Sequence, residues 1–250
     1  MKISMNGLVI WEVKTGEADR VITILGENGL ITAYSKGSLR PKNKLTSSTA
    51  MLSYSNFELY SGKTMYNIDD AISKERFIAL FTDVERYYYA SYFCELMKYL
   101  APIDDDAHDY LALMLNTMHL LNERKKNEHL IKPVFEMRLM TIAGYMPDLT
   151  GCVDCADSQL KNGYFDMQNG IWYCELCAKQ HGKPINCSIP SFAALRHIIY
   201  SESRKIFSFE IPENAILEIN KLSSKYVQIH IDHSLTTLDF LNLITDRIGL

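Results

Sequence analysis

Long apolar runs, internal repeats and low-complexity tracts are all missing from this 250-residue sequence. A helix that crosses a bilayer needs about 20 consecutive apolar residues, and no stretch approaches that length. The first six residues, Met1 to Asn6, lack the apolar core and the cleavage site of a secretory signal peptide. We therefore expect a soluble globular protein of the cytoplasm, with no membrane among its partners.

Acidic residues are missing between positions 28 and 57, although the whole chain carries a formal net charge of −4. Gly37 and Pro41 predict that the middle of this stretch is a loop. The cations in this stretch or shortly before it are candidate DNA contacts: Lys14, Arg20, Lys36, Arg40, Lys42 and Lys44. A plain solvated loop would also explain them, and only the lack of neighbouring carboxylates gives the nucleic-acid interpretation comparable weight.

Cysteines are few, six in all, and four of them form two C-x-x-C pairs. The pairs Cys152/Cys155 and Cys174/Cys177 are 18 residues apart, a spacing typical of zinc ribbons. Asn169-Gly170 between them predicts a hairpin that returns the second pair to the first. Four thiolates would fill a tetrahedral shell, so we expect one structural Zn²⁺. An iron site or a redox-active dithiol is the alternative, and the two matched pairs argue against the dithiol.

The first third of the chain has the apolar–polar alternation and glycine-bearing turns of a small β-barrel. The predicted strands cover residues 8–13, 20–25, 30–34, 50–60 and 64–72. From about residue 74 the period becomes helical, and helices are predicted over residues 77–101, 104–121, 130–143, 191–201, 213–226 and 235–248. The first of them should bury Phe77, Leu80, Phe81, Val84, Tyr88, Ser91 and Tyr92. The expected class is therefore α+β, with several domains.

Two further motifs have competing interpretations. Arg138 falls on the apolar stripe of the helix predicted at 130–143. It is either an arginine that snorkels or pairs with an internal acid, or a cation beside an apolar groove, suited to a peptide that ends in hydrophobic residues and a carboxylate. Gly62-Lys63-Thr64 ends like an ATP-binding loop, but Phe57 stands where that loop requires glycine, so we expect a turn.

The order of these features resembles that of the RecO family of bacterial recombination mediators. The resemblance spans essentially the whole chain. It is carried by TGEADRVI (15–22), SKGSLRPK (35–42) and FEMRL (135–139), the last of which leads through GYMP (144–147) to Cys152.

This resemblance implies an N-terminal OB-fold over 1–75, a helical domain over 76–149 and 185–250, and an inserted zinc-finger module over 150–184. It implies a non-enzymatic protein that binds and anneals single- and double-stranded DNA. Its expected partners are a RecR-like protein and the acidic C-terminal tail of single-stranded-DNA-binding protein, and its expected role is to help load recombinase onto coated strands.

Lys36, Arg40 and Lys42 match the basic loop of the family, Arg20 matches less closely, and Arg138 lies near the expected tail-binding groove. The alternative is a zinc-stabilised protein–protein scaffold without direct DNA contact.

Overall fold

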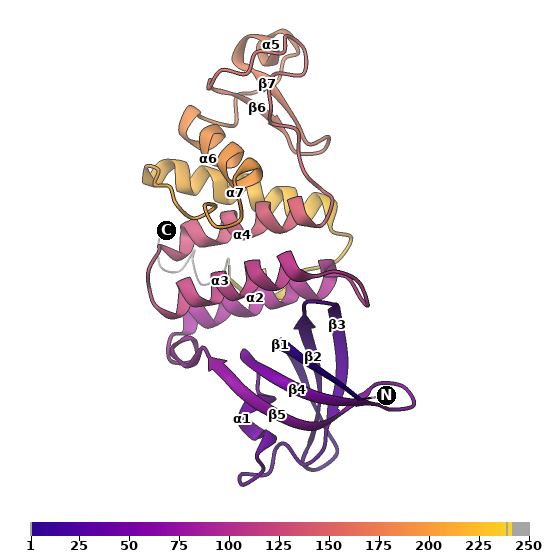
Figure 1. Ribbon diagram of the computed structural model, residues 1–250. Helices are drawn as coiled ribbons and strands as arrows, with labels where there is room; N and C mark the ends of the chain where they lie inside the picture. Colours follow the sequence, from indigo (N-terminus) through magenta and orange to yellow (C-terminus); the bar gives the residue numbers. More distant parts are fainter. Residues whose placement is uncertain (1, 239, 242–250) are drawn as a thin grey trace. The chain divides into compact units, whose positions relative to one another are not determined.

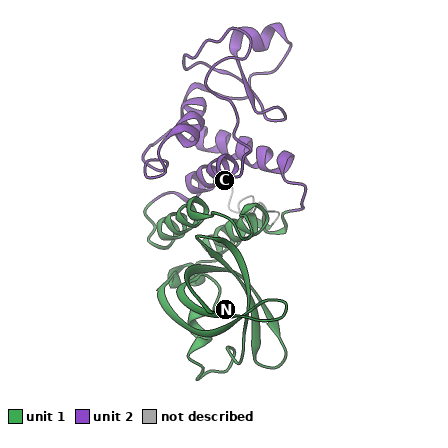
Figure 2. Cartoon of the chain, turned by 45° about the vertical axis from the view of Figure 1, so that its right-hand side comes forward, with its two compact units in different colours: residues 1–125, 235–250 green, residues 126–234 purple. Residues whose placement is uncertain are grey.

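The computed structural model of the chain describes residues 2–238, 240 and 241. The chain divides into two compact units (Figure 2). We call residues 1–125 with 235–250 the barrel unit, and residues 126–234 the cysteine unit. The presence of a β-sheet part and of helices confirms the expected α+β class. The three-domain division expected from the sequence stays a prediction, and the two compact units have other boundaries.

Five strands of the barrel unit form a closed barrel in the order β1-β2-β3-β5-β4, in which β4 pairs back with β1 (Figure 1). β3 and β5 run parallel, whereas the other neighbours are antiparallel. The five predicted strands are therefore present, and the first is much longer than expected. Their bounds are β1 (Lys2–Thr15), β2 (Asp19–Gly26), β3 (Gly29–Ser35), β4 (Ser53–Ser61) and β5 (Tyr66–Arg76).

The barrel core is filled by alternate residues of each strand, because successive side chains of a strand point to opposite faces. On β2, Ile22 and Ile24 are fully buried in the core, and Thr23 between them faces outward. The core also takes in Val9, Ile31, Ala33, Leu45, Phe57, Leu59, Ile68 and Ala71. A bulge between Val9 and Trp11 shifts the register of β1 against β2, which lets this long strand bend around the barrel.

The barrel unit also contains helices, of which the first lies between β3 and β4 and the others follow β5. Their bounds are α1 (Leu45–Ser48), the 3-10 helix η1 (Ile78–Thr82), α2 (Val84–Leu100) and α3 (His108–Asn122). The predicted buried stripe of the first long helix was only partly right: Phe77, Leu80 and Tyr92 are buried, but Phe81 and Val84 are exposed and Tyr89, not Tyr88, is buried. The 3-10 helix η1 precedes α2, so the 3.6-residue period does not run on from Phe77 into α2.

The cysteine unit consists of helices and one hairpin. Its elements are α4 (Glu128–Ile142), β6 (Gly163–Asp166), β7 (Ile171–Cys174), α5 (Glu175–Gln180), α6 (Ile189–Tyr200) and α7 (Glu213–His230). α4 packs against α6 and α7. The segment predicted as a helix over 235–248 is helical at residues 236–238, 240 and 241, and residues 239 and 242–248 lie outside the described residues. Among the described residues, none of the helices has the length and apolar character that a bilayer span requires.

Candidate metal centre and nucleic-acid interface

Four cysteine thiols gather beside the β6–β7 hairpin. The sulfur atoms of Cys152, Cys155, Cys174 and Cys177 all lie within 4.8 Å of one another. The Sγ atoms of Cys155 and Cys174 are 3.8 Å apart. A tetrahedral zinc site with Zn–S bonds of about 2.3 Å requires sulfur–sulfur distances of about 3.8 Å, so the cluster fits such an ion. Among the described residues this is the only group of three or more metal-ligating side chains.

Backbone hydrogen bonds fix the position of each cysteine pair. The first pair lies in a tight loop in which the Ala156 N–H donates to the Cys152 carbonyl at 2.8 Å, and Ala156 takes a positive φ of 57°. The Val153 N–H donates to the Trp172 carbonyl on β7 at 2.9 Å, which holds this loop against the hairpin. Cys174 ends β7, and Cys177 lies in the first turn of α5. The hairpin predicted at Asn169-Gly170 therefore does bring the two pairs together.

The surroundings shift the pKa values of the thiols in different directions. Burial raises the pKa of Cys152, but the backbone N–H groups of Cys155, Cys174 and Asp154 outweigh it and bring this pKa down to about 7. Burial, together with hydrogen bonds to the neighbouring cysteines, raises the pKa of Cys177. Four thiolates cannot accumulate here without a compensating cation, and a divalent metal that binds them must displace their protons.

A second contact joins the two cysteine pairs at the surface. His181, which follows α5, lies 2.7 Å through Nε2 from the Asp154 carboxylate in the first pair. The His181 ring also meets Tyr173 of β7 edge-on at 5.4 Å. The two remaining cysteines, Cys94 and Cys187, are buried as free thiols and do not belong to the cluster.

The basic loop, which we define as residues 36–44, is held to the turn between β1 and β2. The Leu39 N–H donates to the Ala18 carbonyl at 2.8 Å, and the Gly37 N–H donates to the Asp19 carboxylate at 2.6 Å. Asn43 closes the loop from inside, because its amide donates to the Gly37 carbonyl at 2.9 Å. Gly37 has a positive φ of 66°, which glycine adopts without a side-chain clash. The loop is therefore an ordered structure and not a loose connection.

The predicted cations differ in how accessible they are to a DNA phosphate. Lys36, Arg40 and Lys42 are exposed, and Lys14 is exposed at the end of β1 next to the same turn. Within the described part of the chain, no carboxylate forms an ion pair with any of these four. Lys44 is exposed but lies 2.9 Å from Asp70, so a phosphate would have to compete with that carboxylate.

Arg20 was a predicted DNA contact, and its position in the structure argues against that role. Its side chain is only 9% exposed. The guanidinium donates to the Thr46 carbonyl at 3.2 Å and lies 3.7 Å from the Glu12 carboxylate. Arg20 on β2 therefore links Glu12 of β1 to Thr46, which follows the basic loop. In this way it helps to hold the loop in position.

Arg138 on α4 donates to the last carbonyls of α6 and the residues after it. Its Nη1 lies 3.1 Å from the carbonyl oxygens of Ile199 and Ser201, and its Nη2 lies 2.9 Å from Ser203 Oγ. A cation at the C-terminus of a helix is favoured by the helix dipole. This geometry favours the alternative in which the arginine is paired inside the protein, and its partner-binding role stays a prediction.

The weaker motifs of the sequence have structural explanations. Gly62 lies in the turn between β4 and β5, where its N–H donates to the Met65 carbonyl, so the expected turn is confirmed. Asp106 lies just before α3 and accepts a hydrogen bond from the His108 N–H at 3.0 Å. His230 bonds the Tyr226 carbonyl, and the described residues hold no metal-ligating group around it.

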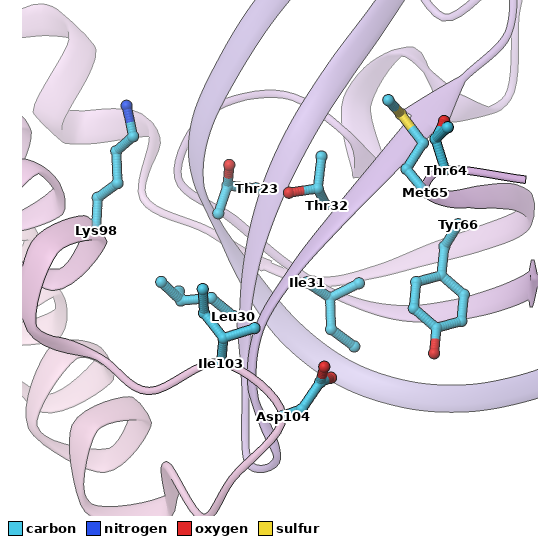
Figure 3. A pocket seen from close by; sticks show the side chains of 10 residues that line it. All are labelled: Thr23, Leu30, Ile31, Thr32, Thr64, Met65, Tyr66, Lys98, Ile103 and Asp104. Atoms are coloured by element: carbon cyan, nitrogen blue, oxygen red, sulfur yellow. The ribbon is translucent and has the colours of Figure 1, made fainter. Parts of the chain in front are cut away.

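One surface of the barrel was not predicted from the sequence. A groove of about 340 Å³ lies on β2 and β3, between the β4–β5 turn and the end of α2, and Lys98 and Asp104 stand at two of its sides (Figure 3). Trp11 lies beside it on β1, with the Lys98 ammonium 4.1 Å from the centre of its ring. The signal that could have found it is an aromatic residue at an outward-facing position of a strand.

Comparisons with known proteins cover almost the whole chain. The model of the family described as "Recombination protein O N terminal" matches residues 1–77, and that described as "Recombination protein O C terminal" matches residues 82–239. Similar proteins include one from Acetivibrio thermocellus, 34% identical over 98% of both chains, and one from Alkaliphilus metalliredigens, 27% identical over 93% of this chain and 95% of the other. A third, from Clostridium perfringens, is 26% identical over 98% of this chain and 99% of the other. All three bear the name DNA repair protein RecO, and this chain belongs to the RecO family of DNA repair proteins.

Proposed function

We propose that this chain is a non-catalytic recombination mediator that binds and anneals DNA strands. The observation that carries this proposal is a set of exposed cations that form no close ion pair with the carboxylates of the described residues, Lys36, Arg40 and Lys42, on an ordered loop next to Lys14. A polyanion gains most from cations that the protein itself does not neutralise, because no internal ion pair has to be broken. Family membership supports the same role, since the relatives are named as DNA repair proteins.

The barrel topology supports an OB-fold as the DNA-binding part. Five strands in the order 1-2-3-5-4 form a small barrel whose loops and β2–β3 face bind oligonucleotides in other OB-folds. The basic loop follows β3 and is hydrogen-bonded to the β1–β2 turn. Its cations therefore lie at the end of the barrel where that turn is. We infer that phosphates of the DNA bind there.

The cysteine cluster would hold one structural Zn²⁺. All four thiols are used, so no coordination position remains for water or substrate, and the ion would stabilise the cysteine unit without taking part in a reaction. The matched pairs and their geometry support zinc over an iron centre or a redox dithiol, which remain outcomes of a metal analysis.

The proposed partners follow from the family. They are single- and double-stranded DNA, a RecR-like protein and the acidic tail of single-stranded-DNA-binding protein, and the proposed place of action is the cytoplasm. In this role the chain would help a recombinase to load onto coated single strands. The competing function is a zinc-stabilised scaffold without DNA contact, which the net charge of −4 favours.

The DNA proposal predicts a defined salt dependence. Replacement of Lys36, Arg40 and Lys42 by Gln should weaken binding to oligo-dT, measured by fluorescence anisotropy. It should also make the slope of log K against log salt less negative by about 2, since each single-strand phosphate contact contributes about 0.7.

The matched control is the replacement of Lys221, Lys225 and Arg204 by Gln. These three are exposed in the cysteine unit and give the same change of charge. If both triple variants lose the same affinity, net charge and not the basic loop governs binding. A wild-type protein that neither binds oligo-dT at low salt nor anneals complementary strands would favour the scaffold.

A further inference from the structure

The groove on the barrel has a lining unlike that of the basic loop. Its walls come from β2, β3, the β4–β5 turn, α2 and the connection after α2 (Figure 3). The apolar part is formed by Leu30, Ile31, Met65 and Ile103, with the ring of Tyr66 at one side. A volume of about 340 Å³ is at the lower end of the range of about 300–1,000 Å³ for small-ligand sites. The groove therefore suits a flat, partly apolar group of limited size.

An aromatic and apolar strip leads from the groove toward the basic loop. Trp11, Thr23 and Thr32 are register partners across β1, β2 and β3, so they form one row on the outer face of the barrel. The next row on the same face is Val13, Val21 and Tyr34, and Lys36 follows it at the start of the loop. From Thr32 to Lys36 the chain covers four residues, about 13 Å of strand. One extended ligand could therefore contact both the groove and the basic loop.

The groove also holds a cation that the protein leaves without a carboxylate. The Lys98 ammonium lies over Trp11, and among the described residues no acidic side chain is within ion-pair distance of it. Asp104 at the other side supplies a hydrogen-bond acceptor. A cation, an indole ring and a carboxylate thus surround one small apolar site.

The wall of the groove after α2 is fixed to the barrel by backbone contacts. The Leu30 N–H donates to the Pro102 carbonyl at 2.8 Å, and the Ala107 N–H donates to the Glu27 carbonyl at 2.7 Å. Gly29 allows this approach, because a Cβ there would lie 2.7 Å from the Pro102 oxygen, and its φ is +97°. The groove is therefore formed before a ligand arrives, which lowers the entropy cost of binding.

We propose that this groove and Trp11 are a base-binding subsite for single-stranded DNA. The base packs on the indole and the apolar wall, its N–H groups donate to Asp104, and its phosphate binds Lys98. A duplex does not fit this subsite, because its bases are stacked and paired and cannot enter the groove. The inference rests on the proposed DNA-binding function. It adds to the phosphate contacts of the basic loop a second contact that depends on the bases of the strand.

Tryptophan fluorescence tests the subsite directly, because the chain has two tryptophans and Trp172 is only 1% exposed. Oligo-dT should quench the emission of Trp11, whereas an abasic oligonucleotide of the same length should bind more weakly and quench little. Trp11→Ala should lower the affinity for oligo-dT about 5- to 150-fold, as expected for the loss of one stacked base. It should leave the affinity for the abasic strand nearly unchanged.

A second variant keeps the test valid if Trp11→Ala fails to fold. Thr32→Glu adds a negative charge to an exposed position in the groove and removes no buried packing. It should also weaken oligo-dT binding, while Phe81→Ala, which changes an exposed aromatic of the barrel unit outside the groove, should not.

The outcomes separate the two proposals. Equal affinity for oligo-dT and the abasic strand, with no quenching and no effect of Thr32→Glu, overturns the base subsite while the basic loop stands. Binding of neither strand at low salt overturns both.

Discussion

Asp19 organises the basic loop even though it is an acid among cations. Its carboxylate accepts hydrogen bonds from the Tyr34 hydroxyl and from the Gly37 N–H, and in this order they lower the pKa of Asp19 below its ordinary 3.8. A carboxylate whose folded pKa is depressed stabilises the fold above its ordinary pKa, and this contribution is lost as the pH falls through the lowered value. The loop should therefore keep its shape throughout the neutral range.

Tyr34→Phe should raise the pKa of Asp19 toward 3.8, because the strongest hydrogen bond to the carboxylate is removed. The carboxyl carbon shift of Asp19, followed by NMR against pH, measures the midpoint. Asp70 is the internal control, because its pKa is lowered chiefly by Lys44 and not by Tyr34. A wild-type midpoint of Asp19 at or above 3.8 would contradict the hydrogen-bonding seen here.

Arg20 and the loop cations differ in how well their exposure could be predicted from the sequence. Lys36, Arg40 and Lys42 lie in a loop marked by glycine and proline, where exposure is easily predicted. Arg20 lies two residues before Ile22 on β2, so strand alternation places it on the inward face, where it is buried. This alternation was visible in the sequence, whereas the contacts of Arg20 with Thr46 and Glu12 depend on the folded structure and were not.

At the scale of elements, the packing of α4 on α7 encloses an ion pair. The Lys132 ammonium lies 3.1 Å from the Glu136 carboxylate, and these side chains are 6% and 0% exposed. Ser223 of α7 donates to the same carboxylate. Both charges lie on α4, and the hydrogen bond from Ser223 joins the pair to α7 at a buried position.

Glu136→Ala should destabilise the cysteine unit by about 3–5 kcal/mol, because it leaves the Lys132 ammonium buried beside fewer acceptors. Urea unfolding measures the loss. The matched control is Glu175→Ala, since Glu175 pairs with Lys179 at the same i,i+4 spacing but on the surface of α5. This variant should cost no more than about 0.5 kcal/mol. Similar losses in both variants would mean that burial does not decide the contribution of the pair.

Elements with a local signal were predicted well from the sequence, and those that depend on distant contacts were not. Asn169-Gly170 marks a hairpin because its backbone geometry is set by the turn residues themselves. The face that α2 buries depends instead on where the 3-10 helix η1 ends and on which strands α2 packs against. Trp11 and Lys98 were missed for the same reason, since their contact joins residues 87 positions apart.

At the scale of the molecule, the cysteine cluster and the basic loop belong to different compact units. The order of the features along the chain predicted both sites, but not that α2 and α3 would group with the barrel. That grouping depends on long-range contacts such as the hydrogen bond from Leu30 to Pro102. The two sites should consequently respond separately to perturbation.

Removal of the metal is the perturbation that separates them. Trp172 of β7 stacks on Phe192 of α6 with ring centres 3.8 Å apart, so its emission reports whether the hairpin stays packed on the helices. In a Trp11→Phe background, a strong chelator should release about one Zn²⁺ per chain and shift the Trp172 emission to the red. The melting temperature of the cysteine unit should fall by about 10 °C or more, because each 1 kcal/mol corresponds to about 4–8 °C in a domain of this size.

Binding of an abasic oligonucleotide, which relies on the basic loop, should meanwhile change less than twofold, because the loop is held by contacts inside the barrel unit. Cys174→Ser should reproduce the effect of the chelator, since three thiolates hold zinc more weakly than four. Cys187→Ser is the matched control, because Cys187 is buried nearby and lies outside the cluster. A purified protein that contains no metal and still shows blue Trp172 emission would mean that the four thiols are stable without an ion. Loss of abasic-strand binding on chelation would instead mean that the cysteine unit takes part in holding DNA.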